Sequence, residues 1–385
     1  LAEYHVVDTN IAGTLTFASA VAQVNTGAID GSAADTGVLV INNTHGSGAT
    51  FITDIGATDL SAINIGTTDG VISNVTFNAS SDSATIALGS GTNVDIVTAN
   101  WVVADAETVA GAITGNATDT VNLNITSSTA ATDHIVTFAG VIDGIDNLTV
   151  GSTTLGGLAT FSAATTAEHV VLKAGDAADG SEDAVATFSG ALTTTDITLN
   201  DTITEEATLT FASSAVTQAV SGDIIAALDG EGTLVVAGAI NDAVTTFSGK
   251  VGVTGVRIAD LNVTSGTNLA TTATFQDEVY ADAILLTAAT TAGEVNANFA
   301  KNVGFTTLTL DDNTTIATVT FNGSETQTVV GNIEGEADTK GLVIVNNDVN
   351  FTGEIGTGTS DGVGNVRIAS GKTLTLTSAT DADGV

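Results

Sequence analysis

An internal repeat limits what this chain can fold into more than any other feature of its sequence. Each of four copies begins with an aromatic residue at the end of a Thr- or Asn-containing run: Phe17, Trp101, Phe211 and Phe321. Ten or eleven residues later each copy has a glycine: Gly27, Gly111, Gly222 and Gly331. These glycines lie 84, 111 and 109 residues apart, a period that indicates one structural unit repeated along the chain.

The four copies also correspond further downstream, where each has a Phe followed by an aliphatic residue and a glycine. These four residues are Phe51, Phe138, Phe247 and Phe351. The pattern predicts repeat units at residues 1–97, 98–207, 208–317 and 318–385, with a short first unit and an incomplete last unit. We expect the four leading aromatic residues to share one equivalent buried position, and the four downstream Phe residues to share another. The incomplete last unit favours a segment of a longer array.

Short runs of alternating side chains recur throughout the chain between clusters of Gly, Asn, Asp, Ser and Thr. Examples are residues 121–126 (VNLNIT), 307–310 (TLTL) and 373–377 (TLTLT). Alternation with period two, bounded by turn residues, predicts β-strands and an all-β fold. Small side chains, 4% aromatic residues and the absence of Pro favour a parallel, β-helix-like β-solenoid built from these repeats. Tandem β-sandwich domains are the alternative, because immunoglobulin-like repeats have a similar period.

The charge balance argues against several classes of partner. The chain has 44 acidic and 7 basic residues and a formal net charge of −37. Such a chain repels the phosphates of nucleic acids, so we expect no nucleic-acid partner. With 43% hydrophobic residues the chain is too apolar for a disordered protein. It has no Cys for a disulfide framework, and we expect no membrane span because no apolar run approaches the roughly 20 residues that one needs.

Three segments of the last unit carry a resemblance to known proteins. They are residues 318–335 (TVTFNGSETQTVVGNIEG), 341–358 (GLVIVNNDVNFTGEIGTG) and 362–378 (GVGNVRIASGKTLTLTS). They resemble the passenger regions of bacterial autotransporters, above all the surface-layer-forming autotransporters of rickettsiae. The richness in Thr, Ala, Gly and Val is also similar to that of alphaproteobacterial S-layer proteins. The resemblance implies an extracellular protein of the cell surface.

No residue spacing points to catalysis. The four histidines are His5, His45, His134 and His169. No two of them have the spacing of zinc ligands, and the chain has no Cys to complete such a set. We therefore expect a protein that is not an enzyme, without catalytic or cofactor-binding residues.

The densest acidic loop is a candidate cation site. It contains Asp176, Asp179, Glu182 and Asp183, and Ca²⁺ prefers carboxylate oxygens presented by loops. The chain has neither an EF-hand loop nor a Gly-Gly-x-Gly-x-Asp array. The loop is either a Ca²⁺ site, which makes calcium the one candidate cofactor, or a solvated acidic loop.

These observations together predict an extracellular structural protein that self-assembles into a surface layer or filament. Its first expected partner is a further copy of itself, and a cell-surface glycan or a host surface are further candidates. An adhesin stalk, or an autotransporter passenger that displays a binding tip, is the alternative. A polysaccharide-acting β-helix enzyme is disfavoured, because such enzymes gather charged and aromatic residues in a cleft and the 7 basic residues here are scattered.

Overall fold

A computed structural model gives the fold of the chain. It describes residues 2–4, 9–68, 72–89, 95–128, 134–176, 182–202, 204–289, 293–312, 315–337, 340–356 and 362–377. The chain is all-β, and its parallel strands stack as a β-solenoid of about 14 turns. This confirms the predicted fold class. The sandwich alternative is wrong, because sandwiches pair their strands antiparallel and the paired strands here run parallel.

The chain divides into two compact units. The first contains Leu1–Thr187, Leu192–Thr194 and Asp201–Glu206, and the second contains Phe188–Ala191, Thr195–Asn200 and Ala207–Val385. Among the described residues, no helix combines the length and the apolar character that a membrane crossing requires.

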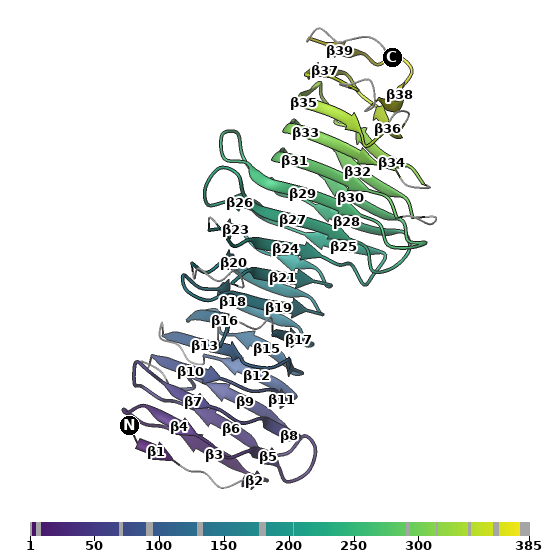
Figure 1. Cartoon of the computed structure of the whole chain (residues 1–385). Helices are drawn as coiled ribbons and strands as arrows, with labels where there is room; N and C mark the ends of the chain where they lie inside the picture. Colours follow the sequence, from purple (N-terminus) through teal and green to yellow (C-terminus); the bar gives the residue numbers. More distant parts are fainter. Residues whose placement is uncertain are drawn as a thin grey trace. The chain divides into compact units, whose positions relative to one another are not determined.

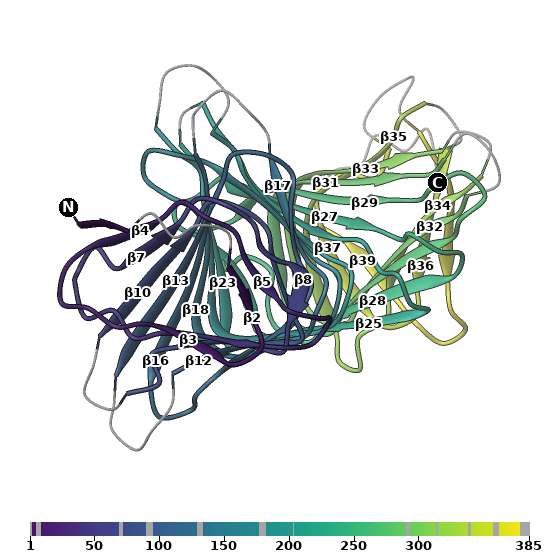
Figure 2. The same cartoon turned by 90° about the horizontal axis from the view of Figure 1, so that it is seen from below.

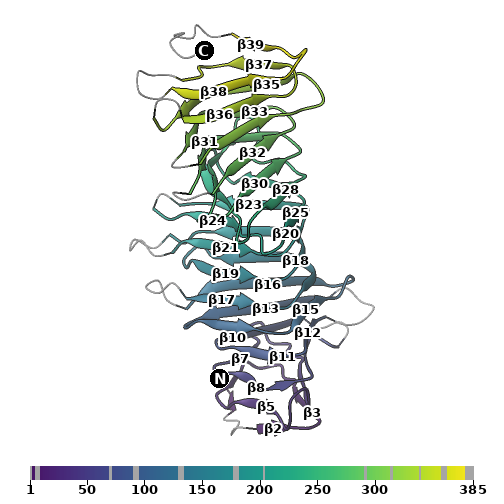
Figure 3. The same cartoon turned by 90° about the vertical axis from the view of Figure 1, so that its right-hand side faces the viewer.

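The first unit is built from three ladders of parallel strands (Figure 1). Ladder 1 comprises β1 (Ala2–Tyr4), β4 (Gln23–Asn25), β7 (Ala49–Phe51), β10 (Ser73–Phe77), β13 (Ile96–Val103), β16 (Thr120–Ser127) and the second halves of β18 (Ile142–Gly151) and β20 (Thr165–Lys173). Ladder 2 comprises β2 (Thr9–Ile11), β5 (Ile29–Gly31), β8 (Ile55–Leu60), β11 (Ser81–Ser83), β14 (Glu107–Val109), β17 (Ile135–Phe138) and β19 (Gly157–Phe161), after which β21 (Ala184–Phe188) follows in the chain. Ladder 3 comprises β3 (Thr14–Phe17), β6 (Val38–Ile41), β9 (Ala62–Ile65), β12 (Thr85–Leu88), β15 (Ala112–Gly115), the first halves of β18 and β20, and β22 (Leu192–Thr193). Figure 2 shows β4, β7, β10 and β13 of ladder 1 following one another, and Figure 3 shows β2, β5, β8 and β11 of ladder 2.

The second unit also has three ladders. Ladder 4 comprises β23 (Asp196–Asn200), β26 (Asp223–Ala226), Val251, the first parts of β31 (Val279–Thr287), β33 (Val303–Asp311) and β35 (Gln327–Gly335), then β37 (Val349–Thr352) and β39 (Leu374–Leu376). Ladder 5 comprises β24 (Ala207–Phe211), β27 (Glu231–Ala237), β29 (Ile258–Thr264) and the second parts of β31, β33 and β35. Ladder 6 comprises β25 (Thr217–Val220), β28 (Ala243–Phe247), β30 (Thr271–Phe275), β32 (Val295–Phe299), β34 (Ala317–Phe321), β36 (Lys340–Val345) and β38 (Val363–Ile368).

Side-chain alternation places the core inside each turn. In β16, Val121, Leu123 and Ile125 are fully buried, whereas Asn122 and Asn124 between them face outward and are half-buried. This is the period-two pattern that the sequence predicts, because neighbouring side chains of a strand point to opposite faces. Each turn therefore adds a thin apolar layer to the core and a polar row to the surface.

Some strands continue around a corner instead of ending there. β18 pairs first with β15 of ladder 3 and then with β16 of ladder 1. Gly144 lies between the two paired parts with φ +70°, a left-handed conformation that costs an L side chain free energy and suits Gly. The corner therefore depends on Gly144.

Each unit contains a column of six aromatic side chains along its core. The first column is Phe17, Phe51, Phe77, Trp101, Phe138 and Phe161. The second column is Phe188, Phe211, Phe247, Phe275, Phe299 and Phe321. Neighbouring ring centroids are 4.9 Å (Phe77–Trp101) to 6.0 Å (Phe299–Phe321) apart, and such pairs contribute about 0.5–1.5 kcal/mol beyond their burial.

The columns change ladder where neighbouring rings meet edge to face. Phe77 and Trp101 are paired residues of one ladder and their rings stack with an interplanar angle of 29°. The next step goes from Trp101 in ladder 1 to Phe138 in ladder 2, and there the angle is 79°. The steps Phe17–Phe51 and Phe211–Phe247 also change ladder, with angles of 79° and 81°. Each of these three steps covers one turn plus about a third of the next.

The predicted equivalence of the repeated aromatic residues is wrong, although all eight are buried as expected. Phe17 lies in ladder 3 but Trp101 in ladder 1, and Phe211 lies in ladder 5 but Phe321 in ladder 6. The downstream set divides in the same way. It places Phe51 in ladder 1, Phe138 in ladder 2, Phe247 in ladder 6 and Phe351 in ladder 4.

The physical reason is that the sequence period is not a whole number of turns. Strand pairing sets the length of one turn, as between Thr9 and Ile29 or between Glu107 and Val136. One repeat of the sequence therefore spans several complete turns and about a third of another turn. Each copy consequently begins one ladder further on. The four-unit division stays a prediction about the sequence pattern.

We predict that Trp101→Phe is tolerated and Trp101→Ala is not. The Trp101 side chain is fully buried, and its Nε1 has no acceptor, so removing the indole N–H leaves no partner unsatisfied. We expect Trp101→Phe to lower the free energy of unfolding by no more than about 1.5 kcal/mol, and Trp101→Ala to lower it by about 3–5 kcal/mol. Denaturant unfolding followed by circular dichroism measures both. Equal losses of unfolding free energy in the two variants would show that the column does not need an aromatic ring at this position.

Candidate functional surfaces

The acidic loop proposed as a Ca²⁺ site is only partly described. Asp179 lies outside the described residues. Glu182 is fully buried, while Asp176 and Asp183 are exposed on either side of it. The backbone N–H of Glu182 donates to Glu205 Oε2 at 3.1 Å, and Asp183 Oδ1 accepts from the backbone N–H of Glu206 at 2.9 Å. In the described part of the chain, no three His or carboxylate groups gather closely enough to hold a metal ion. Calcium at this loop therefore stays a prediction.

Aspartates at the corners bind the backbone of a neighbouring turn. Among the described residues they include nine that accept a backbone N–H at 2.6–3.2 Å from a residue 23 to 29 positions away: Asp30, Asp54, Asp119, Asp146, Asp183, Asp223, Asp229, Asp312 and Asp348. A backbone N–H that leaves the strand ladder at a corner needs an acceptor, and a carboxylate is a strong one. Part of the acidity thus has a structural use.

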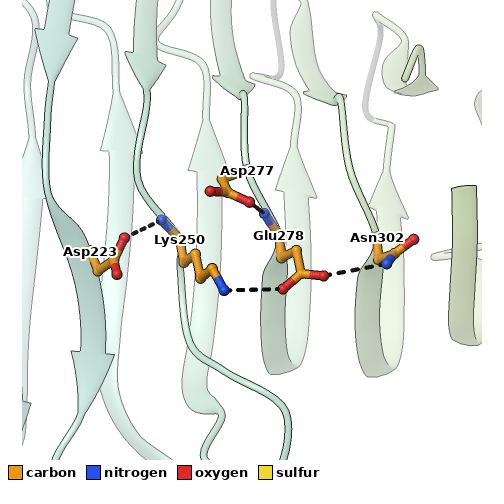
Figure 4. A network of polar contacts seen from close by, with 5 residues as sticks. All are labelled: Asp223, Lys250, Asp277, Glu278 and Asn302. Atoms are coloured by element: carbon orange, nitrogen blue, oxygen red, sulfur yellow. Dashed lines mark hydrogen bonds and ion pairs between the residues drawn. The ribbon is translucent and has the colours of Figure 1, made fainter. Parts of the chain in front are cut away.

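Basic side chains of the second unit also connect turns. Figure 4 shows one row of such contacts. Asp223 Oδ1 accepts from Lys250 N at 2.8 Å, Lys250 Nζ lies 3.4 Å from Glu278 Oε2, and Asn302 Nδ2 donates to Glu278 Oε1 at 3.3 Å. The hydrogen bond to Glu278 raises the pKa of Lys250. The row crosses four successive turns and fixes their register.

Three further basic residues make similar contacts. Arg257 Nη1 reaches Asp282 Oδ1 at 3.4 Å and Thr306 Oγ1 at 3.3 Å, which lie on the next two turns. Lys340 Nζ donates to the carbonyl oxygen of Asp312 at 2.8 Å. Lys372 Nζ donates to Asn347 Oδ1 at 2.6 Å. Each of these basic side chains connects its own turn to another turn, and the three do not share a contact.

Two buried glutamines satisfy carbonyl groups at the corners. Gln327 Nε2 donates to the carbonyls of Phe299 at 2.9 Å and Lys301 at 2.7 Å, and Gln218 Nε2 donates in the same way to Phe188 and Gly190. Gln218 lies in ladder 6 and Gln327 in ladder 4. Each stands four positions before a glycine of the sequence repeat, Gly222 or Gly331. Their equivalent places in the repeat were a signal that the sequence analysis missed.

Two carboxyl groups in ladder 2 of the first unit, those of Glu107 and Asp82, have raised pKa values. Glu107 is 5% exposed and its Oε2 has no hydrogen-bond partner. Burial raises the pKa of Glu107 to about 7, with a backbone hydrogen bond from Ala104 opposing the shift. Burial also raises the pKa of Asp82, and the charges of Asp59 and Asp54 raise it further. These groups are part of the core and its edge and do not line a described cavity.

A second such group lies in the last part of the second unit. Burial raises the pKa of Asp311 to about 6, and the hydrogen bond with Glu336 and the charge of that residue add to the shift. The charge of Lys340 and a hydrogen bond with Thr287 oppose the shift.

The described histidines lie apart from one another along the chain. His45 Nδ1 accepts the backbone N–H of Ser47 at 3.0 Å, which makes it part of a local turn. His169 Nε2 lies 3.8 Å from Glu168 Oε1 on the exposed corner of β20. His5 is outside the described residues. The contacts of these side chains give no support to a catalytic arrangement.

The outward side of ladder 1 carries ladders of asparagine. Asn100 Nδ2 donates to Asn74 Oδ1 at 2.8 Å, and Asn124 Nδ2 donates to Asn100 Oδ1 at 2.9 Å. In the adjacent row Asn147 Nδ2 donates to Asn122 Oδ1 at 2.8 Å. The amides thus hold one another in fixed orientations across successive turns.

Comparisons with known proteins identify no relative: no family model, no curated protein and no solved structure matches this chain.

We predict that Glu107→Gln stabilises the first unit above neutral pH. Between pH 4.5 and about 7 the unfolded state ionises Glu107 while the folded state keeps it protonated, so the wild type loses stability as the pH rises. The loss is complete above pH 7 and amounts to roughly 3 kcal/mol. Denaturant unfolding from pH 4 to 8 should show the variant gaining on the wild type over this window. The exposed Asp143→Asn variant controls for the loss of one charge. Equal pH profiles for Glu107→Gln and wild type would contradict the buried neutral state.

We predict that Gln327→Leu destabilises the second unit although it keeps the side chain's size. It leaves two carbonyls and the backbone N–H of Gly323, which donates to Gln327 Oε1 at 2.8 Å, without their partner. The free energy of unfolding should fall by about 1–3 kcal/mol. The matched change Thr328→Val, at the neighbouring outward position, should have a much smaller effect. A Gln327→Leu variant as stable as the wild type would show that water satisfies these groups equally well.

Proposed function

We propose that this chain is a non-catalytic, extracellular structural protein of a prokaryotic cell surface, which assembles with copies of itself into a surface layer or filament. The observation that supports this most is how its charged groups are used. Aspartates, lysines and one arginine bind across turns, and in the described residues they do not converge on a metal group. Such an arrangement serves a repetitive scaffold.

The sequence supports the same proposal. The net charge of −37 disfavours nucleic acid as a partner. The segments 318–335 and 341–358 resemble surface-layer-forming autotransporter passengers. A cell-surface glycan or a host surface remains a further candidate partner of such a scaffold.

Electron microscopy of the purified chain tests the assembly directly. A two-dimensional array or a long polymer, reproducible at physiological ionic strength, is the expected result. Isolated particles at all concentrations would contradict self-assembly and favour an adhesin stalk, whose binding tip would have to be sought elsewhere.

We further predict that divalent cations strengthen the assembly. Each copy carries the same charge sign, and salt screens this repulsion with a Debye length of roughly 8 Å at physiological ionic strength. Ca²⁺ bridging exposed carboxylates such as Asp176 and Asp183 would oppose the repulsion at contact. Adding a chelator should dissolve most of the assembly, Ca²⁺ should restore it, and circular dichroism should stay unchanged. Assemblies that keep their size in chelator would exclude the cation contribution.

A further inference from the structure

One outward surface of the first unit consists almost entirely of Asn and Thr side chains. It is formed by the outward side chains of β7, β10, β13, β16 and the second half of β18, and we name it the amide–hydroxyl face. Its members are Thr50, Asn74, Thr76, Thr98, Asn100, Val102, Asn122, Asn124, Thr126, Asn147 and Thr149, all half-buried. None of them is charged, over five turns of a chain whose net charge is −37.

The face is rigid. The asparagine hydrogen bonds already described join Asn74, Asn100 and Asn124 across three turns, and Asn122 and Asn147 across two. Asn100 Nδ2 also donates to the carbonyl of Val75 at 2.9 Å. A partner therefore meets side chains that have already lost their conformational freedom, which lowers the entropy cost of binding.

Two large apolar side chains lie exposed at its edge. Ile72 is 59% exposed and Ile96 is 42% exposed. The pairing of Ser73 with Val97 places these two isoleucines side by side on successive turns. They extend the uncharged surface beyond the Asn and Thr rows and offer apolar area that a contact would remove from water.

The net negative charge of the chain limits which of its surfaces can contact a second copy. Copies of a chain at −37 repel one another wherever carboxylates meet, and ladder 2 of the same unit presents Asp30, Asp59 and Asp82. Ladder 3 is also uncharged from β3 to β15, but its strands have only four residues each. With strands up to eight residues long, the amide–hydroxyl face offers roughly 500 Å² per copy. Two copies would then bury about 1,000 Å², the lower bound for a specific interface.

We propose that the amide–hydroxyl face is the surface through which two copies of this chain pack laterally. The two sheets would lie face to face, related by a two-fold axis, with Asn and Thr rows interdigitating as in a dry Asn-rich sheet interface. This inference rests on the proposed function and names one lateral contact of the assembly, which pairs two copies.

The test introduces charge on this face and on a matched one. The double variant Thr76→Glu/Thr149→Glu adds two carboxylates to the amide–hydroxyl face, and Thr108→Glu/Thr160→Glu adds two, on strands that are not adjacent, to the outward side of ladder 2 with the same net charge. Sedimentation at physiological salt should show association weakened at least about tenfold by the first pair and almost unchanged by the second. Circular dichroism and the fluorescence of Trp101, the only Trp of the chain, check that both variants are folded.

Each other outcome has a defined meaning. Equal weakening by both pairs would reduce the effect to net charge and overturn the proposal. No weakening by either pair would place the contact elsewhere and leave the proposed self-assembly standing. A wild type that stays monomeric would overturn both, and retention of that monomer on an insoluble neutral glycan, lost in Thr76→Glu/Thr149→Glu, would reassign the face to glycan binding.

A cross-linking experiment gives a second readout. The chain has no Cys, so Thr76→Cys and Thr108→Cys each carry a single thiol. A short bis-maleimide should join two copies of Thr76→Cys, and it should leave Thr108→Cys mostly unlinked. The reverse preference would exclude the amide–hydroxyl face as the lateral contact.

Discussion

Contact between aromatic rings of successive turns is the interaction on which the rest of each unit depends. A ring such as Phe275 lies 4.9 Å from Phe247 on one side and 5.2 Å from Phe299 on the other. A slip of one residue in any turn would point that turn's ring into solvent, because neighbouring side chains of a strand face opposite ways. The two columns therefore set the register of the strands, and the residue directly before each of their twelve rings is Thr or Asn. The polar rows on the surface follow from the same register.

Corners are the second constraint, because the chain turns there and its backbone groups leave the ladders. The sequence meets this with Asp acceptors, with buried Gln218 and Gln327, and with a few cations such as Lys250 and Arg257. These groups bind from one turn to the next, so the charge is concentrated at corners while the flat outer sides of ladders 1 and 3 are largely neutral. A chain of this kind combines high net charge with uncharged surfaces.

Much of the fold could be predicted from the sequence, and the parts that could not have identifiable reasons. Period-two runs such as 121–126 are strands with the expected sides buried, and all eight repeated aromatic residues are in the core. Their predicted equivalence was wrong because an alignment on Phe17, Trp101 and Phe211 follows the aromatic columns. Directly after each of these three residues the column moves to the next ladder. The length of one turn could be read from the shorter intervals between consecutive rings, such as the interval from Phe77 to Trp101. Burial of Glu107 had the same overlooked signal, because Glu107 stands four positions before Gly111 of the repeat, as Gln218 and Gln327 stand before their glycines.

A double-mutant cycle on Phe275 and Phe299 tests the central claim most directly. The variants Phe275→Leu, Phe299→Leu and their combination keep apolar volume but remove the ring contact. Denaturant unfolding of the four proteins should give a coupling energy of about 0.5–1.5 kcal/mol. The same cycle on Phe275 and Phe305, a buried ring outside the column, should give additive losses. Additive losses for Phe275 and Phe299 as well would contradict the account, because they would mean that the rings stabilise each turn separately and do not hold successive turns in register.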